Sequence, residues 1–222
     1  MKSYLWFLIV PTIQLIGDSI GFEYEGVSVK NGKKQFVVKR YIPDECAKLP
    51  IVNEIVWTGN YADPKVPDGC KSTYVHTTGH LQPMKLDVDV ETYGELEVLA
   101  FIKEMQEDDH LMLIDGRKEE WFEYLTIPGA VNIPFEYIKY RDHFVFEFEN
   151  AMKKLGVKIK DEDIYDFSNA KTIVVFCNGP WCSQSVSMVK ALIEIGYPHD
   201  KIKWYRGGLQ HWLGAGMTGT RN

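Results

Sequence analysis

Several patterns that would place this sequence in a class at once are missing from its 222 residues. Basic residues do not outnumber acidic ones: the formal net charge is −6, so nothing in the composition points to nucleic acid or an anionic membrane as a partner. No apolar run approaches the roughly 20 residues that a membrane-spanning helix needs. The four cysteines form no pair of Cys-x-x-Cys motifs, so we expect no structural zinc site, and neither a metal nor an organic cofactor is indicated.

The longest apolar stretch lies near the N-terminus and is typical of a signal peptide. Lys2 gives a short positive start, residues 5–16 are almost wholly apolar, and Ser19 and Gly21 offer small residues for cleavage. We therefore expect residues 1–21 to direct export, which would make the protein periplasmic or secreted. A buried N-terminal strand is the alternative for the same residues.

Residues 22–91 indicate a small β-rich extension. Asn31-Gly32 is a strong hairpin signal between two partly alternating stretches. Cys46 and Cys70 both lie in this part of the chain, each near proline, glycine or aspartate. If the chain is exported to an oxidising compartment, these two cysteines are candidates for a disulfide.

Residues 92–222 have the alternating pattern of an α/β domain with a mainly parallel sheet. The unbroken apolar runs at 111–114 and 173–176, the second within a strand predicted over 171–177, predict strands that are covered on both faces. Thr92 and Glu95 fit a capping box at the start of the first helix. Helices are predicted over 92–107, 119–125, 147–155 and 183–195, and a last strand over 202–205.

Cys177 ends the strongest predicted strand and begins a loop that is suited to hold a thiolate. The loop leads directly into a helix with Ser183 as its N-cap, and helix N-termini carry unpaired N–H groups and partial positive charge. Gly179 lets the backbone curl so that N–H groups face inward, which lowers the pKa of a thiol placed there. An inert buried cysteine is the alternative, but the glycine loop and the second thiol, Cys182, favour a reactive centre.

Four short motifs resemble the rhodanese family in their order and spacing. They are Leu113-Ile114-Asp115-Gly116-Arg117, Ile127-Pro128-Gly129-Ala130-Val131-Asn132-Ile133-Pro134, the loop that starts at Cys177, and Arg206-Gly207-Gly208 with Trp212. The resemblance covers residues 92–216. It implies a rhodanese-like parallel sheet flanked by helices and a sulfurtransferase in which Cys177 becomes a persulfide and passes sulfur to a nucleophile. It also implies that the loop Cys177–Cys182 holds the anionic sulfur.

The resemblance implies roles for the residues around this loop. Cys177 is expected to be the nucleophile and sulfur carrier, and Asp115 and Arg117 are expected to brace the site. Substrate-binding groups are expected at Asn178, Gly179, Pro180, Trp181, Cys182, Ser183 and Arg206. For Trp181, the two interpretations are a binding face for a partner and a lid that packs on the domain.

Two features of the loop depart from the family pattern. The loop carries no lysine or arginine, which counts against thiosulfate as the donor unless Arg206 or Arg117 supplies the charge. The alternatives are that Arg117 pairs with an acidic residue and that Arg206 is a solvated turn residue. Cys182 stands where a hydroxyl residue is common in the family. A second thiol there either resolves the Cys177 persulfide or forms a reversible disulfide with it.

The expected partners are a small sulfane-sulfur donor (thiosulfate, polysulfide or a protein persulfide) and a thiol or other nucleophilic acceptor, or a partner protein. Two other functions stay open. One is a non-catalytic rhodanese-like sulfur-carrier or binding module, and the other is a thiol–disulfide redox protein that uses Cys177 and Cys182. A phosphatase of the related group needs arginine six residues after the cysteine to clamp phosphate, and Ser183 stands at that position.

Overall fold

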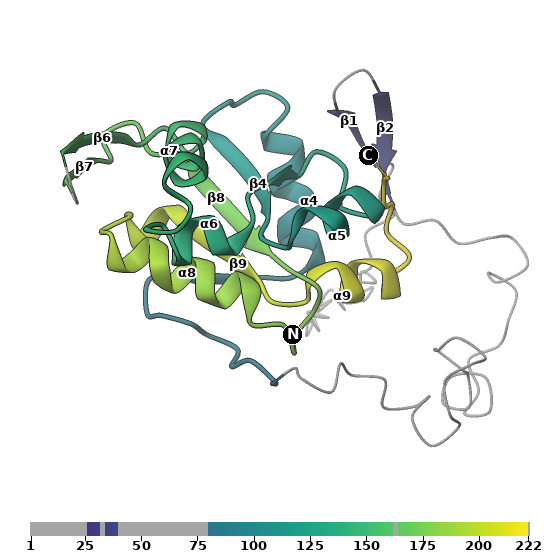
Figure 1. Ribbon diagram of the computed structural model, residues 1–222. Coiled ribbons are helices and arrows are strands. Elements are labelled where there is room, and N and C mark those ends of the chain that lie inside the picture. The colour runs from purple at the N-terminus through teal and green to yellow at the C-terminus, as the bar shows by residue number, and fades with distance from the viewer. Residues whose placement is uncertain (1–25, 32–33, 40–79, 162–163, 222) are drawn as a thin grey trace, which may run out of the picture.

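A five-stranded parallel sheet forms the centre of the protein (Figure 1). The computed structural model describes residues 26–31, 34–39, 80–161 and 164–221. The strand order is β3-β9-β8-β4-β5, where the strands are β3 (Glu91–Tyr93), β4 (Leu111–Asp115), β5 (Val131–Asn132), β8 (Thr172–Phe176) and β9 (Ile202–Tyr205). Because every pair in this sheet is parallel and helices flank it, the predicted α/β architecture is confirmed.

Helices cover both faces of the sheet and divide the core into two clusters (Figure 1). One face is covered by α6 (Phe135–Lys139), α7 (Val145–Lys154) and α8 (Gln184–Glu194), and the other by α4 (Glu95–Glu104), α5 (Glu119–Tyr124) and α9 (Gly208–Gly214). A short 3-10 helix, η1 (His199–Lys201), precedes β9. Each loop between these elements therefore lies at one of the two edges of the sheet where strands begin or end.

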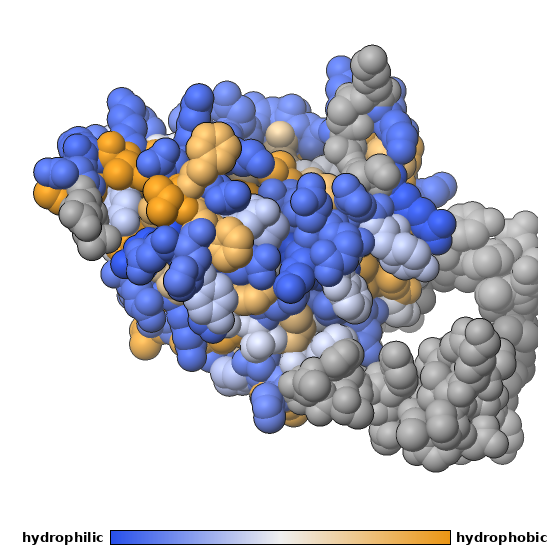
Figure 2. Space-filling view, in the orientation of Figure 1, coloured by the Kyte–Doolittle hydropathy of each residue, from blue (hydrophilic) through white to orange (hydrophobic). Residues whose placement is uncertain are grey.

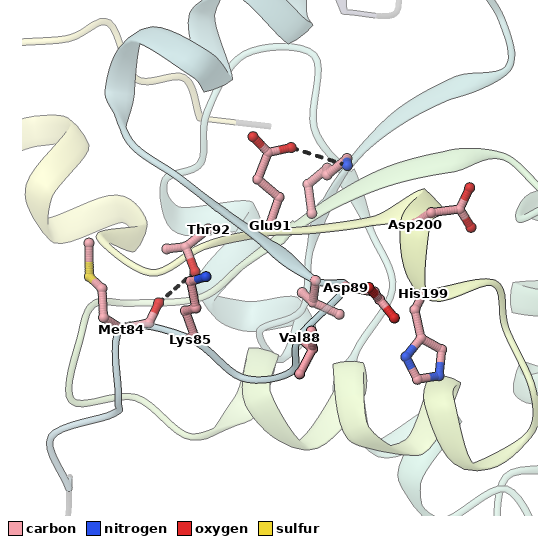
Figure 3. A pocket seen from close by; sticks show the side chains of 10 residues that line it. Met84, Lys85, Val88, Asp89, Glu91, Thr92, His199 and Asp200 are labelled. Atoms are coloured by element: carbon pink, nitrogen blue, oxygen red, sulfur yellow. Dashed lines mark hydrogen bonds and ion pairs between the residues drawn. The ribbon is translucent and has the colours of Figure 1, made fainter.

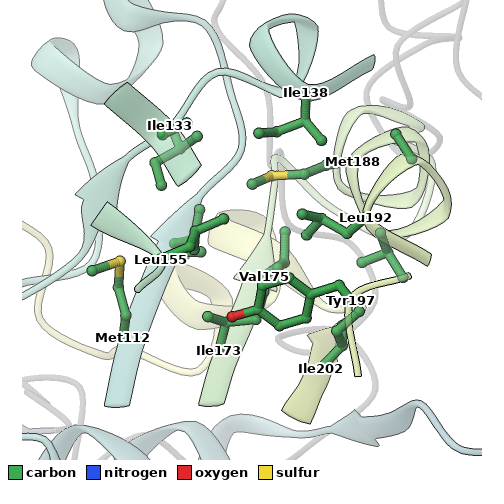
Figure 4. Packing of buried hydrophobic residues seen from close by; sticks show 14 of the residues in the cluster. Met112, Ile133, Ile138, Leu155, Ile173, Val175, Met188, Leu192, Tyr197 and Ile202 are labelled. Atoms are coloured by element: carbon green, nitrogen blue, oxygen red, sulfur yellow. The ribbon is translucent and has the colours of Figure 1, made fainter. Parts of the chain in front are cut away.

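Strand β8 lies in the middle of the sheet and is buried on both sides. Ile173 and Val175 point into the cluster beneath α8, whereas Val174 and Phe176 point into the cluster beneath α4. Figure 4 shows Ile173 and Val175 packed with side chains of α8. Burial of one such side chain contributes about 1.5–3 kcal/mol. The unbroken apolar run in the sequence has this two-sided burial as its physical cause.

The start of the domain differs from its prediction. Thr92 was expected to cap a helix, but it lies in β3, where it pairs with Trp204 of β9. Helix α4 begins only at Glu95, after the N-cap Gly94, and the Glu97 carboxylate accepts a hydrogen bond from the Gly94 amide at 2.9 Å. Half of a capping box is therefore present two residues further along the chain, because Gly94 has no side chain to return the bond. Pairing with β9 satisfies backbone groups of residues 91–93 that a helix would otherwise have used.

The predicted N-terminal hairpin is present and packs on the domain. Strands β1 (Val27–Asn31) and β2 (Lys34–Val38) pair antiparallel. Val27, Val29 and Val38 are buried in the same cluster as helix α4. The chain also returns to this hairpin near its C-terminus, where the Thr218 amide donates to the Lys39 carbonyl at 3.0 Å. The hairpin is thus held both by apolar burial and by backbone hydrogen bonds.

A second hairpin, which the sequence did not predict, carries exposed apolar side chains. It consists of β6 (Lys158–Asp161) and β7 (Ile164–Asp166). Ile159 and Ile164 are exposed, and Val145 and Phe146 at the start of α7 are exposed as well. Figure 2 shows apolar surface at the end of the molecule that carries this hairpin.

Some predictions fall outside the described residues. They concern the signal peptide at residues 1–21 and the pairing of Cys46 with Cys70, and both stay predictions. None of the helices in the described part of the chain combines the length and the apolar character that crossing a membrane requires.

Candidate active site

The loop after β8 places two thiols at the carboxyl edge of the sheet. Cys177 directly follows β8, and α8 begins at Gln184. Ser183 is the N-cap residue of α8, as predicted, but its side chain makes no capping hydrogen bond. The exposed fraction of Cys177 is 2% and that of Cys182 is 5%. In parallel sheets, ligand sites form at this edge, so the loop stands where chemistry is expected.

The sulfur of Cys177 lies against a buried serine. Its Sγ is 3.1 Å from Ser185 Oγ, and Trp204 Nε1 donates to the same oxygen at 3.0 Å. Because an indole N–H can only donate, the Ser185 hydroxyl keeps its own proton for Cys177 Sγ. The Ser185 amide also points to this sulfur and, like the hydroxyl, lowers the pKa of Cys177. Ser185 and Trp204 therefore hold Cys177 in place and favour its anionic form.

The two thiols form one coupled pair. Burial raises the pKa of Cys177 well above its usual value, and Cys182 raises it further. The pKa of Cys182 is lowered to about 7, chiefly by the hydrogen bond from Cys177. Burial opposes that shift, while the amides of Gln184 and Asn178 and the charge of Arg117 add to it. The pair therefore loses its first proton near neutral pH and keeps the second, which the two sulfurs share.

The carbonyl groups of residues 177–181 in the loop have hydrogen-bond partners outside the loop or across its turn. The amides of Leu209, Gln210, Cys182, Gln82 and His80 lie 2.8–3.0 Å from the oxygens of Cys177, Asn178, Gly179, Pro180 and Trp181, in that order. With these five oxygens engaged, the Cys182 carbonyl, 3.4 Å from Cys177 Sγ, is the loop carbonyl that faces a sulfur, beside the amides of Asn178, Gln184 and Ser185. Inward-facing amides of this kind are suited to an anion, which is what the sequence led us to expect from Gly179 and the helix N-terminus.

Asp115 and Arg117 form a buried ion pair behind the loop. Arg117 Nη2 is 2.6 Å from Asp115 Oδ2, and the exposed fractions of the two side chains are 2% and 0%. Thr126 Oγ1 donates to the same carboxylate at 2.7 Å. Arg117 Nη1 also donates to Asn178 Oδ1 at 3.1 Å. The pair thus links the end of β4 to the first residue of the loop after Cys177.

Arg206 holds a segment of the N-terminal extension against the loop. We call residues 80–83 the strap, because the His80 and Gln82 amides bond to the carbonyls of Trp181 and Pro180. Arg206 Nε and Nη2 donate to the Gln82 carbonyl at 3.1 and 3.0 Å, and Nε also lies 3.2 Å from the Pro83 carbonyl. The guanidinium therefore hydrogen-bonds to the strap, whereas the sequence led us to expect that Arg206 binds the substrate.

The strap contact gives a direct prediction for Arg206. Replacing Arg206 with alanine removes these charged hydrogen bonds, so the strap should detach about tenfold more often, which corresponds to ~1.4 kcal/mol. We expect trypsin to cut after the exposed Lys85 about tenfold faster than in the unchanged protein. Arg206→Lys keeps the charge but not the forked donors and should give an intermediate rate. Equal cutting rates in all three proteins would show that Arg206 does not hold the strap.

A separate groove of about 580 Å³ lies on the other edge of the sheet (Figure 3). Its lining includes His199 and Asp200, which precede β9, whereas Cys177 follows β8. Among the described residues, His199, Asp87 and Asp89 are the group whose ligand atoms are close enough to share a metal ion. His199 Nδ1 lies 3.1 Å from Asp87 Oδ1, so these two already pair with each other.

Two residues at the site, Ser185 and Trp204, were not predicted from the sequence, although the position of Ser185 gave a reason to expect a role. Ser185 lies on the buried stripe of α8 beside Val186 and Val189. A hydroxyl at a core position of an amphipathic helix needs a partner, which could have drawn attention to it. Trp204 had no such signal, because an aromatic residue in a buried strand is ordinary packing.

The family comparison agrees with the geometry. The family model of the rhodanese-like domain matches residues 99–215, which is more than half of the chain. A search of curated proteins found no match.

Solved structures similar to this chain include proteins from three bacteria. A protein from Bacillus halodurans is 19% identical over 60% of this chain and 78% of its own, with a TM-score of 0.42. A rhodanese with anions from E. coli is 25% identical over 50% of this chain and 99% of its own, with a TM-score of 0.31. A thiosulfate sulfurtransferase from Pseudomonas aeruginosa is 17% identical over 60% of this chain and 20% of its own, with a TM-score of 0.39.

Proposed function

Because the chain belongs to the rhodanese-like domain family, we propose that it is a sulfurtransferase whose Cys177 carries sulfane sulfur as a persulfide. The observation that carries this proposal is the arrangement of amides around the two sulfurs. The amides of Asn178, Gln184 and Ser185 point to them, and the carbonyls of residues 177–181 are bonded elsewhere. Preorganised N–H donors stabilise an anionic sulfur without reorganisation when the charge develops.

The coupled thiols supply the nucleophile for the first step. Above a pH of about 7 the pair carries one negative charge, which rests mainly on Cys182. The proton of Cys177 can pass along the hydrogen bond to Cys182, which leaves a Cys177 thiolate. Ser185 then stabilises that thiolate through its hydroxyl and its amide. Cys182 thus acts as the base for Cys177 in this step.

Sulfur transfer then proceeds by two displacements. The Cys177 thiolate attacks the outer sulfur of the donor, a new S–S bond forms, and the rest of the donor leaves with the electron pair of the broken S–S bond. The product is the Cys177 persulfide. An acceptor thiolate attacks its outer sulfur, and the Cys177 thiolate leaves. Each half-reaction conserves charge and electrons, so no further oxidant or reductant is needed.

The charges around the loop favour a donor without a sulfonate group. Residues 178–183 include no lysine or arginine. Arg117 pairs with Asp115, and Arg206 is bonded to the strap. A doubly charged thiosulfate therefore lacks a cation to hold it, and its desolvation on entering the loop is costly. We propose polysulfide or a protein persulfide as the donor.

The test measures the mass of the protein after exposure to polysulfide. It uses the Cys182→Ser chain, in which the second thiol cannot react with the transferred sulfur. We expect a gain of about 32 Da that cyanide removes. The Cys177→Ser chain is the matched control and should show no cyanide-sensitive gain in the peptide that carries the loop. Because Cys182 is also the proposed base, the gain should appear more slowly in this chain; no gain in the Cys182→Ser chain and no persulfide or loop disulfide in the unchanged protein would contradict the proposed function.

A further inference from the structure

Resting on the sulfurtransferase proposed above, we propose that Cys182 attacks the Cys177 persulfide and releases its outer sulfur as hydrosulfide. The reaction leaves a Cys177–Cys182 disulfide, which an external dithiol reopens. Cys182 is then a catalytic residue. Over the whole cycle the dithiol supplies two electrons, and these reduce the sulfane sulfur to hydrosulfide. The sequence left open whether the second thiol resolves the persulfide or only forms a reversible disulfide, and the geometry points to resolution.

The two thiols lie beside each other in the folded loop. Cys177 and Cys182 hydrogen-bond through their thiols, and Cys177 Sγ also lies 3.4 Å from the Cys182 carbonyl oxygen. The turn between them is closed by the bond from the Cys182 amide to the Gly179 carbonyl at 2.9 Å. A disulfide requires that the two Cα atoms lie within about 7 Å. Sulfurs in hydrogen-bond contact across such a turn need only a small side-chain movement to join.

The local charges favour Cys182 as the attacking thiolate. The amides of Asn178 and Gln184 point to its sulfur, and the charge of Arg117 adds to their effect. These amides and this charge remain in place when Cys177 carries sulfur, so they continue to lower the pKa of Cys182 and favour its thiolate as the attacking group. Ser185 holds Cys177 Sγ, the atom under attack, at 3.1 Å. The electrophile and the nucleophile are therefore both held in position before the reaction.

Burial gives the internal thiol an advantage over an external one. The exposed fraction of Cys177 is 2%, and the strap is hydrogen-bonded to the loop at Pro180 and Trp181. A thiol from solution must pass these groups, whereas Cys182 is already beside the target. Well-oriented internal groups act at very high effective concentration. Resolution by Cys182 should therefore be faster than transfer to a monothiol in solution.

The step balances in atoms and electrons. The Cys182 thiolate forms a bond to Cys177 Sγ, and the bond from Sγ to the outer sulfur breaks. Hydrosulfide leaves with that electron pair, so the sulfane sulfur is reduced while the two thiols are oxidised to a disulfide. The external dithiol then supplies two electrons and two protons through a mixed disulfide and becomes a disulfide itself. A dithiol is favoured over a monothiol because its second sulfur completes the exchange within the same complex.

The experiment follows a single turnover of the full chain with polysulfide and no reductant. Samples are quenched with acid, alkylated and weighed, and released hydrosulfide is measured in parallel. Trypsin yields one peptide, residues 172–190, that contains Cys177 and Cys182 but neither of the other cysteines, so the changes can be localised. We expect a species heavier by about 32 Da to appear first and then to give way to a disulfide, lighter than the starting protein by about 2 Da.

The variants separate this inference from the proposed function. In Cys182→Ser the heavier species should persist, and hydrosulfide release should fall at least tenfold. Ser187→Ala is the control: Ser187 lies in the first turns of α8, but the proposed reaction does not use it, so this variant should behave like the unchanged protein. If the unchanged protein keeps its persulfide and releases no hydrosulfide, the inference is wrong and the sulfurtransferase proposal stands. If neither chain gains the sulfur, both are wrong.

The pH dependence gives an independent readout. Because only the Cys182 thiolate attacks, the decay of the persulfide should accelerate as pH rises through the pKa of Cys182 in the persulfide form and then level off. Dithiothreitol should restore repeated hydrosulfide release in the unchanged protein, and the release with dithiothreitol should be slower in Cys182→Ser, because the dithiol must then attack the persulfide from solution. A decay rate that does not change between pH 5 and pH 9 would count against an attacking thiolate at this position.

Discussion

Alanine at position 208 should cost about 3 kcal/mol of stability and remove most of the sulfur transfer. Gly208 begins α9 with a φ of +57°, a conformation that costs a residue with a side chain about 1–2 kcal/mol. An added Cβ would lie 2.4 Å from the Cys177 carbonyl oxygen and 2.7 Å from the Gly179 amide nitrogen. Both neighbours are backbone atoms, so no flexible side chain can move aside. Either α9 or the loop must shift, and the amides around the sulfurs shift with it.

Gly214 provides the matched control in the same helix. A Cβ added there meets no atom within 4 Å. We expect Gly214→Ala to change the free energy of unfolding by less than about 1 kcal/mol. Urea unfolding and the rate of persulfide formation should be measured for both variants. Wild-type values for Gly208→Ala in both assays would contradict the close approach of α9 to the loop.

Asp115→Asn should destabilise the protein by about 3–5 kcal/mol, because it leaves the charge of Arg117 buried without a counter-charge. The carboxylate now accepts bonds from Arg117 Nη2 at 2.6 Å, Arg117 Nε at 2.9 Å and Thr126 Oγ1 at 2.7 Å. An amide can accept at only one atom and presents donors to the guanidinium with its other. Arg117 should then release Asn178 Oδ1, which it holds at 3.1 Å.

This variant also has a readout at the site itself. Because Asn178 and Arg117 help to lower the pKa of Cys182, that pKa should rise in Asp115→Asn, and thiolate absorbance should appear at higher pH. Glu91→Gln is the control, since Glu91 is exposed and its ion pair with Lys203 at 3.2 Å should be worth less than about 1 kcal/mol. The double variant Asp115→Asn/Arg117→Met should recover part of the lost stability. A loss no larger than that of Glu91→Gln would contradict the role of the buried pair.

The sequence predicted those parts of the fold whose causes are local. The run before Cys177 is apolar because β8 is buried on both faces, and the last strand was placed at residues 202–205, where β9 lies. The loop was found because a strand end, a glycine and a helix start are adjacent in the chain. Its amides do point to sulfur, which follows from the turn of the backbone itself.

The parts that the sequence did not predict depend on contacts between distant residues. Thr92 was assigned to a helix because its capping pattern is local, but the partner that makes it a strand, Trp204, is more than a hundred residues away. The strap reaches Pro180 and Trp181 from a similar distance, and Arg206 binds it through backbone carbonyls that carry no sequence signature. Hairpin β6–β7 is short and largely exposed, so it leaves little hydrophobic pattern to detect.

The loop lies between two segments, α9 and the strap, which differ in how often they detach from it. On one side, α9 is anchored by Leu209 and Trp212 in the core, so its bonds to the loop break only when the domain unfolds. On the other side, the strap is held by two amides and Arg206, and its Leu81 is largely exposed. Opening from the strap side therefore requires only local detachment of the strap, which occurs far more often than unfolding of the core. The thiol pair can be sealed from bulk water at rest and still admit a reactant from that single direction.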